Sequence, residues 1–160
     1  MATVTKKRIA SQQVFGGVPY GNATTLEFPL VTNASGVWTD SDLTTAVAIA
    51  DILRLGILPA GFRLHDALAI VSDAFTALTT GKLGFAYVDG VDSTDVPQDD
   101  DYFSASVTFN AIGRYLANNL AVRPVTLPKD AYLIVTWAGA NNAVVGIADI
   151  LVRGIHVGPP

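Results

Sequence analysis

The segment Val145–Val157, with the sequence VGIADILVRGIHV, decides the fold class. Gly146 and Gly154 lie within it, and glycine is a poor residue for a helix interior. Side chains in this segment alternate with a period of two, which is typical of a β-strand. One of the two alternating series consists of Val145, Ile147, Asp149, Leu151, Arg153, Ile155 and Val157. The segment therefore predicts a strand that forms part of a sheet.

Five further runs have the same short, alternating or β-branched character, and Gly, Pro and Asp residues separate them. They are Thr24–Val31, Phe62–Val71, Lys82–Val88, Ser104–Ile112 and Ala131–Trp137. Pro29 restricts the first run to a sheet edge, because proline has no backbone N–H for a neighbouring strand. Strands do not alternate with long helical patterns, so a parallel sheet is not expected. The sequence predicts an all-β, antiparallel sandwich or barrel.

Residues 42–55 allow two interpretations. Asp40 or Ser41 as a cap and Gly56 as a terminating residue favour a helix. However, Ile49–Leu53 (IADIL) recurs as Ile147–Leu151 at an offset of 98 residues, where a strand is predicted. We therefore favour a strand for both copies, in similar environments of one sandwich.

At 160 residues, the chain is long enough for one domain with one hydrophobic core. We assign residues 1–22 to an extended N-terminal arm and residues 23–160 to a single β-sandwich domain. The arm combines basic, Gly and Pro residues with apolar side chains that suit a purely solvated tail poorly. We expect it to contact a partner protein through Lys6, Lys7, Arg8, Phe15 and Tyr20.

The composition favours a surface that partners cover. Charged residues make up 15% of the chain and apolar residues 50%, whereas about a quarter charged is usual. No apolar run has the length of a membrane-spanning helix or a secretory signal. The net charge of −4 disfavours nucleic acid as a partner. We expect self-association as a homodimer or homotrimer, and neither nucleic-acid nor membrane binding.

We find no pattern that indicates catalysis or a cofactor. The two histidines, His65 and His156, both fall in predicted strands and suit surface positions. Phosphate-binding glycine loops and nucleophile elbows are absent from the sequence. The chain is therefore predicted not to be an enzyme. Trp38, Trp137 and Tyr115 suit either core positions, which we favour, or stacking platforms for a small ligand.

Six aspartates gather within residues 89–101, and such carboxylates can bind calcium. They are Asp89, Asp92, Asp95, Asp99, Asp100 and Asp101. Their spacing differs from that of a calcium loop, and no glutamate closes the run. We expect a solvated loop that charge repulsion keeps extended, with no metal site.

A series of stretches, in this order, resembles the small head structural proteins of tailed bacteriophages, the decoration or cement class. The similarity spans about residues 44–158 and leaves out the arm. Its main pieces are Asp51–Gly61, Ala69–Phe75, Leu83–Gly90, Asp99–Phe103, Leu127–Leu133 and Asp149–Ile155.

The resemblance implies a jelly-roll-like β-sandwich and no catalytic residues. It implies a virion protein that is made in the host cytoplasm, binds the outside of the capsid and reinforces contacts between major capsid protein subunits. Two alternatives stay open at this point: another virion component, such as a tail or fibre part, and a β-sandwich that binds a carbohydrate or small ligand.

Overall fold

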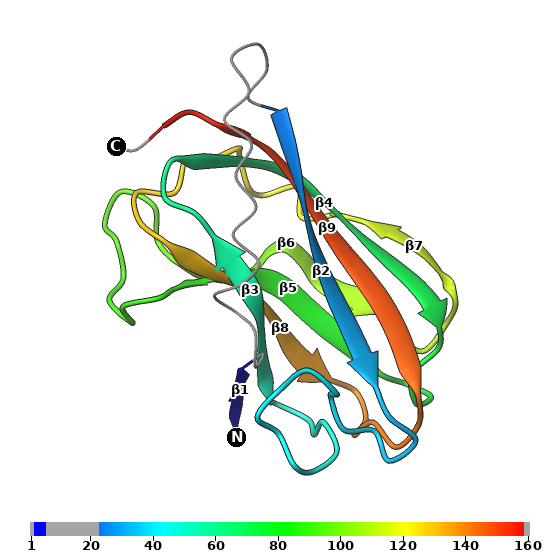
Figure 1. The fold of residues 1–160 in the computed structure, drawn as a ribbon. Helices are drawn as coiled ribbons and strands as arrows, with labels where there is room; N and C mark the ends of the chain where they lie inside the picture. The colour runs from blue at the N-terminus through cyan, green and yellow to red at the C-terminus, as the bar shows by residue number, and fades with distance from the viewer. Residues whose placement is uncertain (1, 6–22, 159–160) are drawn as a thin grey trace.

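The computed structural model describes residues 2–5 and 23–158, and in this part of the chain the regular secondary structure is β-strand. Two sheets pack on each other as layers (Figure 1). The strands are β1 (Thr3–Thr5), β2 (Ala23–Thr32), β3 (Ile52–Leu58), β4 (Phe62–Asp73), β5 (Thr80–Tyr87), β6 (Asp99–Thr108), β7 (Gly113–Leu116), β8 (Ala131–Ala138) and β9 (Gly146–His156). The predicted all-β sandwich is confirmed.

One sheet has the strand order β1-β3-β8-β5-β6 and the other the order β2-β9-β4-β7. The short pair β1–β3 is parallel, and the other pairs are antiparallel. Most connections carry the chain from one sheet to the other, so neighbouring strands are usually distant in sequence. Buried apolar residues from both sheets form one core cluster.

The core lies between the sheets and is built from the alternating inward side chains that the sequence predicted. On β5, Leu83, Phe85 and Tyr87 are buried, while Lys82 and Ala86 on the opposite face are half-buried. Each fully buried large apolar side chain contributes about 1.5–3 kcal/mol to stability. The aromatic residues of this core also contact one another edge to face.

Most predicted strands are confirmed with small boundary shifts. The segment Val145–Val157 corresponds to β9, which pairs with β2 and β4 and is therefore internal to its sheet. The run Thr24–Val31 forms β2 at the sheet edge, as Pro29 required. The run Ser104–Ile112 was placed too late in the chain, because β6 spans Asp99–Thr108.

The strand predicted over residues 42–55 is wrong for its first ten positions, since β3 begins at Ile52. The Asp51 carboxylate accepts hydrogen bonds from the backbone N–H groups of Ala48 and Ala2, at 2.9 and 3.1 Å. Ala50 has a φ of 71°, in the left-handed region. This local hydrogen bonding competes with strand pairing and produces a turn.

The two IADIL copies are therefore not equivalent. The copy at 147–151 lies wholly within β9, whereas only the last two residues of the copy at 49–53 belong to β3. The two strands also lie in different sheets. The expectation of similar environments was wrong: the two copies share their residue sequence but not their structural environment.

Candidate interaction surfaces

The five residues predicted to contact a partner, Lys6, Lys7, Arg8, Phe15 and Tyr20, lie outside the described residues. The two histidines are placed as the sequence predicted. His65 is exposed on β4, and His156 is half-buried at the end of β9. Within residues 2–5 and 23–158, no helix is long and apolar enough to cross a bilayer.

The candidate stacking residues do not form a ligand platform. Trp38 and Trp137 are both buried in the core. Trp137 stacks on Phe109 with ring centroids 5.2 Å apart and donates its Nε1–H to the carbonyl of Ala140 at 2.9 Å. Tyr115 is half-buried and donates its hydroxyl to the carbonyl of Ala111. The core interpretation of both tryptophans is confirmed.

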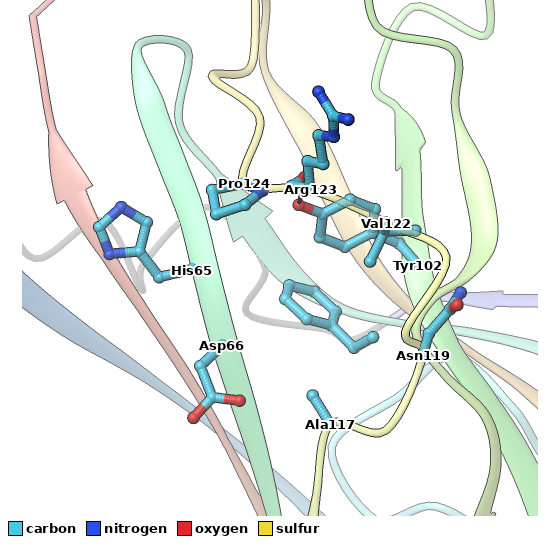
Figure 2. A pocket seen from close by; sticks show the side chains of 9 residues that line it. His65, Asp66, Tyr102, Ala117, Asn119, Val122, Arg123 and Pro124 are labelled. Atoms are coloured by element: carbon cyan, nitrogen blue, oxygen red, sulfur yellow. Dashed lines mark hydrogen bonds between the residues drawn. The ribbon is translucent and has the colours of Figure 1, made fainter.

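A hollow lies where the loop after β7 crosses β4 and β6 (Figure 2). Its volume is about 140 Å³, below the roughly 300–1,000 Å³ of small-molecule sites. Tyr102 holds the wall of this hollow in place, because its hydroxyl donates a hydrogen bond to the carbonyl of Arg123 at 2.7 Å. Burial raises the pKa of Tyr102. Asp66 and His65 lie along its β4 side (Figure 2). This hollow is therefore smaller than an ordinary small-molecule site.

The acidic segment is not entirely a solvated loop, because Asp99, Asp100 and Asp101 form the start of β6. Their carboxylates lie within 4.8 Å of one another. Lys82 of β5 forms a salt bridge with Asp100 at 3.1 Å. A hydrogen bond with Asp99 and desolvation raise the pKa of Asp101, which indicates carboxylates that repel one another. This part of the predicted loop was wrong.

The pKa of Asp89 is lowered from 3.8, chiefly by its hydrogen bond with Lys129 and then by the backbone N–H of Val91. Because the pKa of Asp89 is lower in the folded state, its ionised carboxylate stabilises the fold above pH 3.8. This stabilisation is lost as the pH falls through the folded-state pKa of Asp89. We therefore expect the Asp89 carboxyl to titrate below 3.8 in ¹³C NMR. Lys129→Met should raise its midpoint toward 3.8, whereas Lys82→Met should leave it unchanged. An unchanged midpoint in Lys129→Met contradicts this assignment.

Asn142 joins three loops at one end of the sandwich, which we call the loop end: residues 33–51, 74–79 and 139–145. Its side chain is 1% exposed. The carbonyl oxygen accepts from the N–H and the hydroxyl of Thr76, both at 3.1 Å. The amide nitrogen donates to the hydroxyl of Thr32 and the carbonyl of Val144, both at 2.9 Å. Figure 1 shows these loops together at the end where β9 begins.

The loop end also concentrates backbone strain. Ala50 and Leu78 have φ values of 71° and 70°, which cost about 1–2 kcal/mol each for residues other than glycine. Such strain persists only where surrounding contacts enforce it, and it is frequent at functional sites. Apolar side chains are exposed on the same loops: Ile49, Leu78, Val144 and Val145. The loop end is thus a rigid surface that presents apolar groups to solvent.

The second surface is the outward face of the sheet β2-β9-β4-β7, which we call the outer sheet face. Cross-strand pairing places its residues in two adjacent rows. One row is Glu27, Leu151, Leu68 and Leu116, and the other is Pro29, Asp149, Ile70 and Arg114. Leu68 is only 5% exposed although it points away from the core. An antiparallel sheet commonly turns a polar face to water, and this face is substantially apolar.

The sequence analysis missed both surfaces, although each has a signal. In residues 147–155, both alternating series contain large apolar side chains, which is typical of a strand covered on two faces. At the loop end, Asn142 is a polar residue in an apolar stretch, which requires hydrogen-bond partners if it is buried. The partners themselves are 66 and 110 residues distant for Thr76 and Thr32, so sequence spacing does not identify them.

No protein-family model matches the chain, and no curated protein matches it. A chain in the capsid of Ralstonia phage GP4 has the same fold, with a TM-score of 0.61, 17% identity, and coverage of 98% of this chain and 100% of that one. A chain in the cyanophage Pam1 capsid asymmetric unit gives a TM-score of 0.56 and 12% identity, and 92% of each chain is covered. The resemblance to phage head proteins is therefore confirmed at the level of the fold: this chain has the fold of proteins found in phage capsids.

Proposed function

We propose that this chain is a structural protein of a phage virion that binds the outside of the capsid and reinforces contacts between major capsid protein subunits. The observation that carries the proposal is the fold match over nearly the full length of both chains. The match covers 98% of this chain and all of the GP4 capsid chain, so the similarity involves the whole sandwich and not a part of it. The eight strands β2–β9, divided equally between two sheets, fit a jelly roll.

The loop end is the surface that we propose for capsid attachment. Its exposed apolar side chains gain about 25 cal/mol per Å² of apolar area when a partner covers them. The Asn142 hydrogen bonds hold the loops in place before binding, so little conformational entropy is lost on attachment. Contacts from many copies to adjoining capsid subunits then oppose separation of those subunits.

We propose that self-association and the arm support attachment. The low charge of the chain favours association between copies, as a dimer or trimer. Lys6, Lys7, Arg8, Phe15 and Tyr20 are proposed to contact the capsid or a neighbouring copy. Val4, just before them, is buried in the core, so substitution tests the arm better than deletion does.

The experiment is co-sedimentation with purified capsid shells of the phage that encodes the chain. Leu78 is 72% exposed, so Leu78→Gly removes an interface side chain and also relieves the positive φ. We expect unchanged or higher thermal stability together with at least tenfold weaker binding, which is about 1.4 kcal/mol. Replacing the five arm residues with alanine should also weaken binding.

The matched control is Leu120→Gly, because Leu120 is 97% exposed but lies in the loop after β7. This variant should bind shells as the unmodified chain does. Equal binding by Leu78→Gly and the unmodified chain contradicts attachment through the loop end. Failure of the unmodified chain to bind shells, with binding to tail structures instead, contradicts the capsid proposal itself.

A further inference from the structure

The charged row of the outer sheet face is symmetrical about β4. Ile70 of β4 pairs with Asp149 of β9 on one side and with Arg114 of β7 on the other. Neighbouring strands are about 4.8 Å apart, so the two charged residues lie about 10 Å apart along the row. Among the salt bridges that the described residues form, none includes Asp149 or Arg114.

The apolar row has the same arrangement. Leu68 of β4 pairs with Leu151 of β9 and with Leu116 of β7. Leu116 is well exposed and Leu151 is half-buried, so both can contact a partner. The register between the two rows is regular, because the bulges of β4 fall between Leu64 and Asp66 and beyond Val71.

We propose that two copies of this chain pair through the outer sheet face, about a twofold axis that runs parallel to β4. This inference rests on the self-association proposed above and names its surface and stoichiometry. Rotation about this axis exchanges the positions of β9 and β7 on the facing copy. Asp149 then faces Arg114 of the other copy, and Leu151 faces Leu116. Leu68 and Ile70 each face their own counterparts.

Charge complementarity is the reason for choosing a second copy as the occupant. Within the overlap, Asp149 and Arg114 each meet the opposite charge under this single rotation, and Leu151, Leu68 and Leu116 each meet a leucine. The next row holds Asp66 and Arg153, which form a salt bridge within one copy. Sheets that pack face to face lie about 10 Å apart, a separation that Asp and Arg side chains span together. Glu27 at the β2 edge lies outside the overlap and stays in water.

The overlap consists of β9, β4 and β7, because rotation about an axis along β4 leaves β2 with no strand opposite it. The half-buried Asp149 and the exposed Arg114 lie on either side of this axis, where charge pairs between the two copies favour this orientation over others.

The test is sedimentation equilibrium of the full chain and three variants, without capsid shells. Arg114→Asp places two aspartates opposite each other, and Asp149→Arg places two arginines opposite each other. Each single variant should raise the dimer dissociation constant at least tenfold. The double variant Asp149→Arg/Arg114→Asp restores opposite charges with their positions exchanged, so its dissociation constant should return to within about threefold of the original. Arg123→Asp, an exposed charge reversal outside this face, should leave the dimer unchanged.

Thermal melts of all variants separate misfolding from loss of association, and Arg114→Gln with Asp149→Asn provides a neutral pair if a reversal unfolds the chain. A monomeric unmodified chain at tens of micromolar overturns the inference. Single reversals that leave the dimer intact also overturn it, and so does a double variant that fails to recover. Since no shells are present, these results are independent of capsid binding, whose failure is observed in the co-sedimentation assay alone.

Discussion

Asn142→Ala is expected to lower the free energy of unfolding by about 3 kcal/mol, because it removes several buried hydrogen bonds and leaves Thr32 and Thr76 with fewer partners. For a chain of this length, that corresponds to a fall of roughly 10 °C in melting temperature. The loops of the loop end lose their common anchor, so amide hydrogen exchange should increase there first. Chemical denaturation and hydrogen exchange measure the two effects.

Asn141→Ala is the control for this result. Asn141 is the adjacent residue, is exposed, and accepts one hydrogen bond from the backbone of Ile49 at 2.8 Å. Its loss should cost less than about 1 kcal/mol. If Asn142→Ala costs no more than Asn141→Ala, Asn142 does not organise the loop end, and the rigid surface proposed for capsid attachment loses its physical basis.

Gly84→Ala is expected to destabilise the sandwich by about 3 kcal/mol or more. A Cβ atom at this position would lie 2.1 Å from the carbonyl oxygen of Asp99 and 2.4 Å from the carbonyl carbon of Asp100. Both atoms belong to the β6 backbone, so a side-chain rotation cannot relieve the overlap. β5 and β6 must separate, and the acidic start of β6 moves with them. Denaturant unfolding gives the size of the effect.

Gly90→Ala distinguishes steric overlap from backbone strain. Gly90 has a φ of 71°, and no atom lies within 4 Å of a Cβ built there. Its substitution should cost only the left-handed conformation, about 1–2 kcal/mol. Equal losses for the two variants would mean that β6 does not cross Gly84 as closely as described.

The strands that the sequence predicted well are those in which the inward and outward series differ in polarity. Lys82–Val88 places large apolar side chains on one face only, and β5 follows that pattern. The strand β7 was missed because four residues, Gly113–Leu116, are too few to establish a period. The acidic start of β6 was missed because like charges favour a loop locally. Its strand conformation depends on Lys82 and on the space at Gly84.

The interaction surfaces were harder to predict than the sandwich because they depend on register. The alternation in β9 indicates which residues share a face, but it does not show that Leu68 and Leu116 continue the row from Leu151. A shift of one residue in either pairing would turn these side chains to the other face. The positive φ of Ala50 also involves a distant contact, since its backbone N–H donates to the carbonyl of Trp137 on β8 in addition to the local hydrogen bonds of Asp51. Tertiary contacts, which the sequence pattern does not specify, determine both.

The capsid proposal is tested most directly by electron cryomicroscopy of shells from the encoding phage, prepared with and without this chain. The proposal predicts additional density on the outer shell surface, over junctions between major capsid protein subunits, into which the sandwich fits with its loop end toward the shell. Identical maps from the two preparations, or density confined to the tail or to the shell interior, would contradict it.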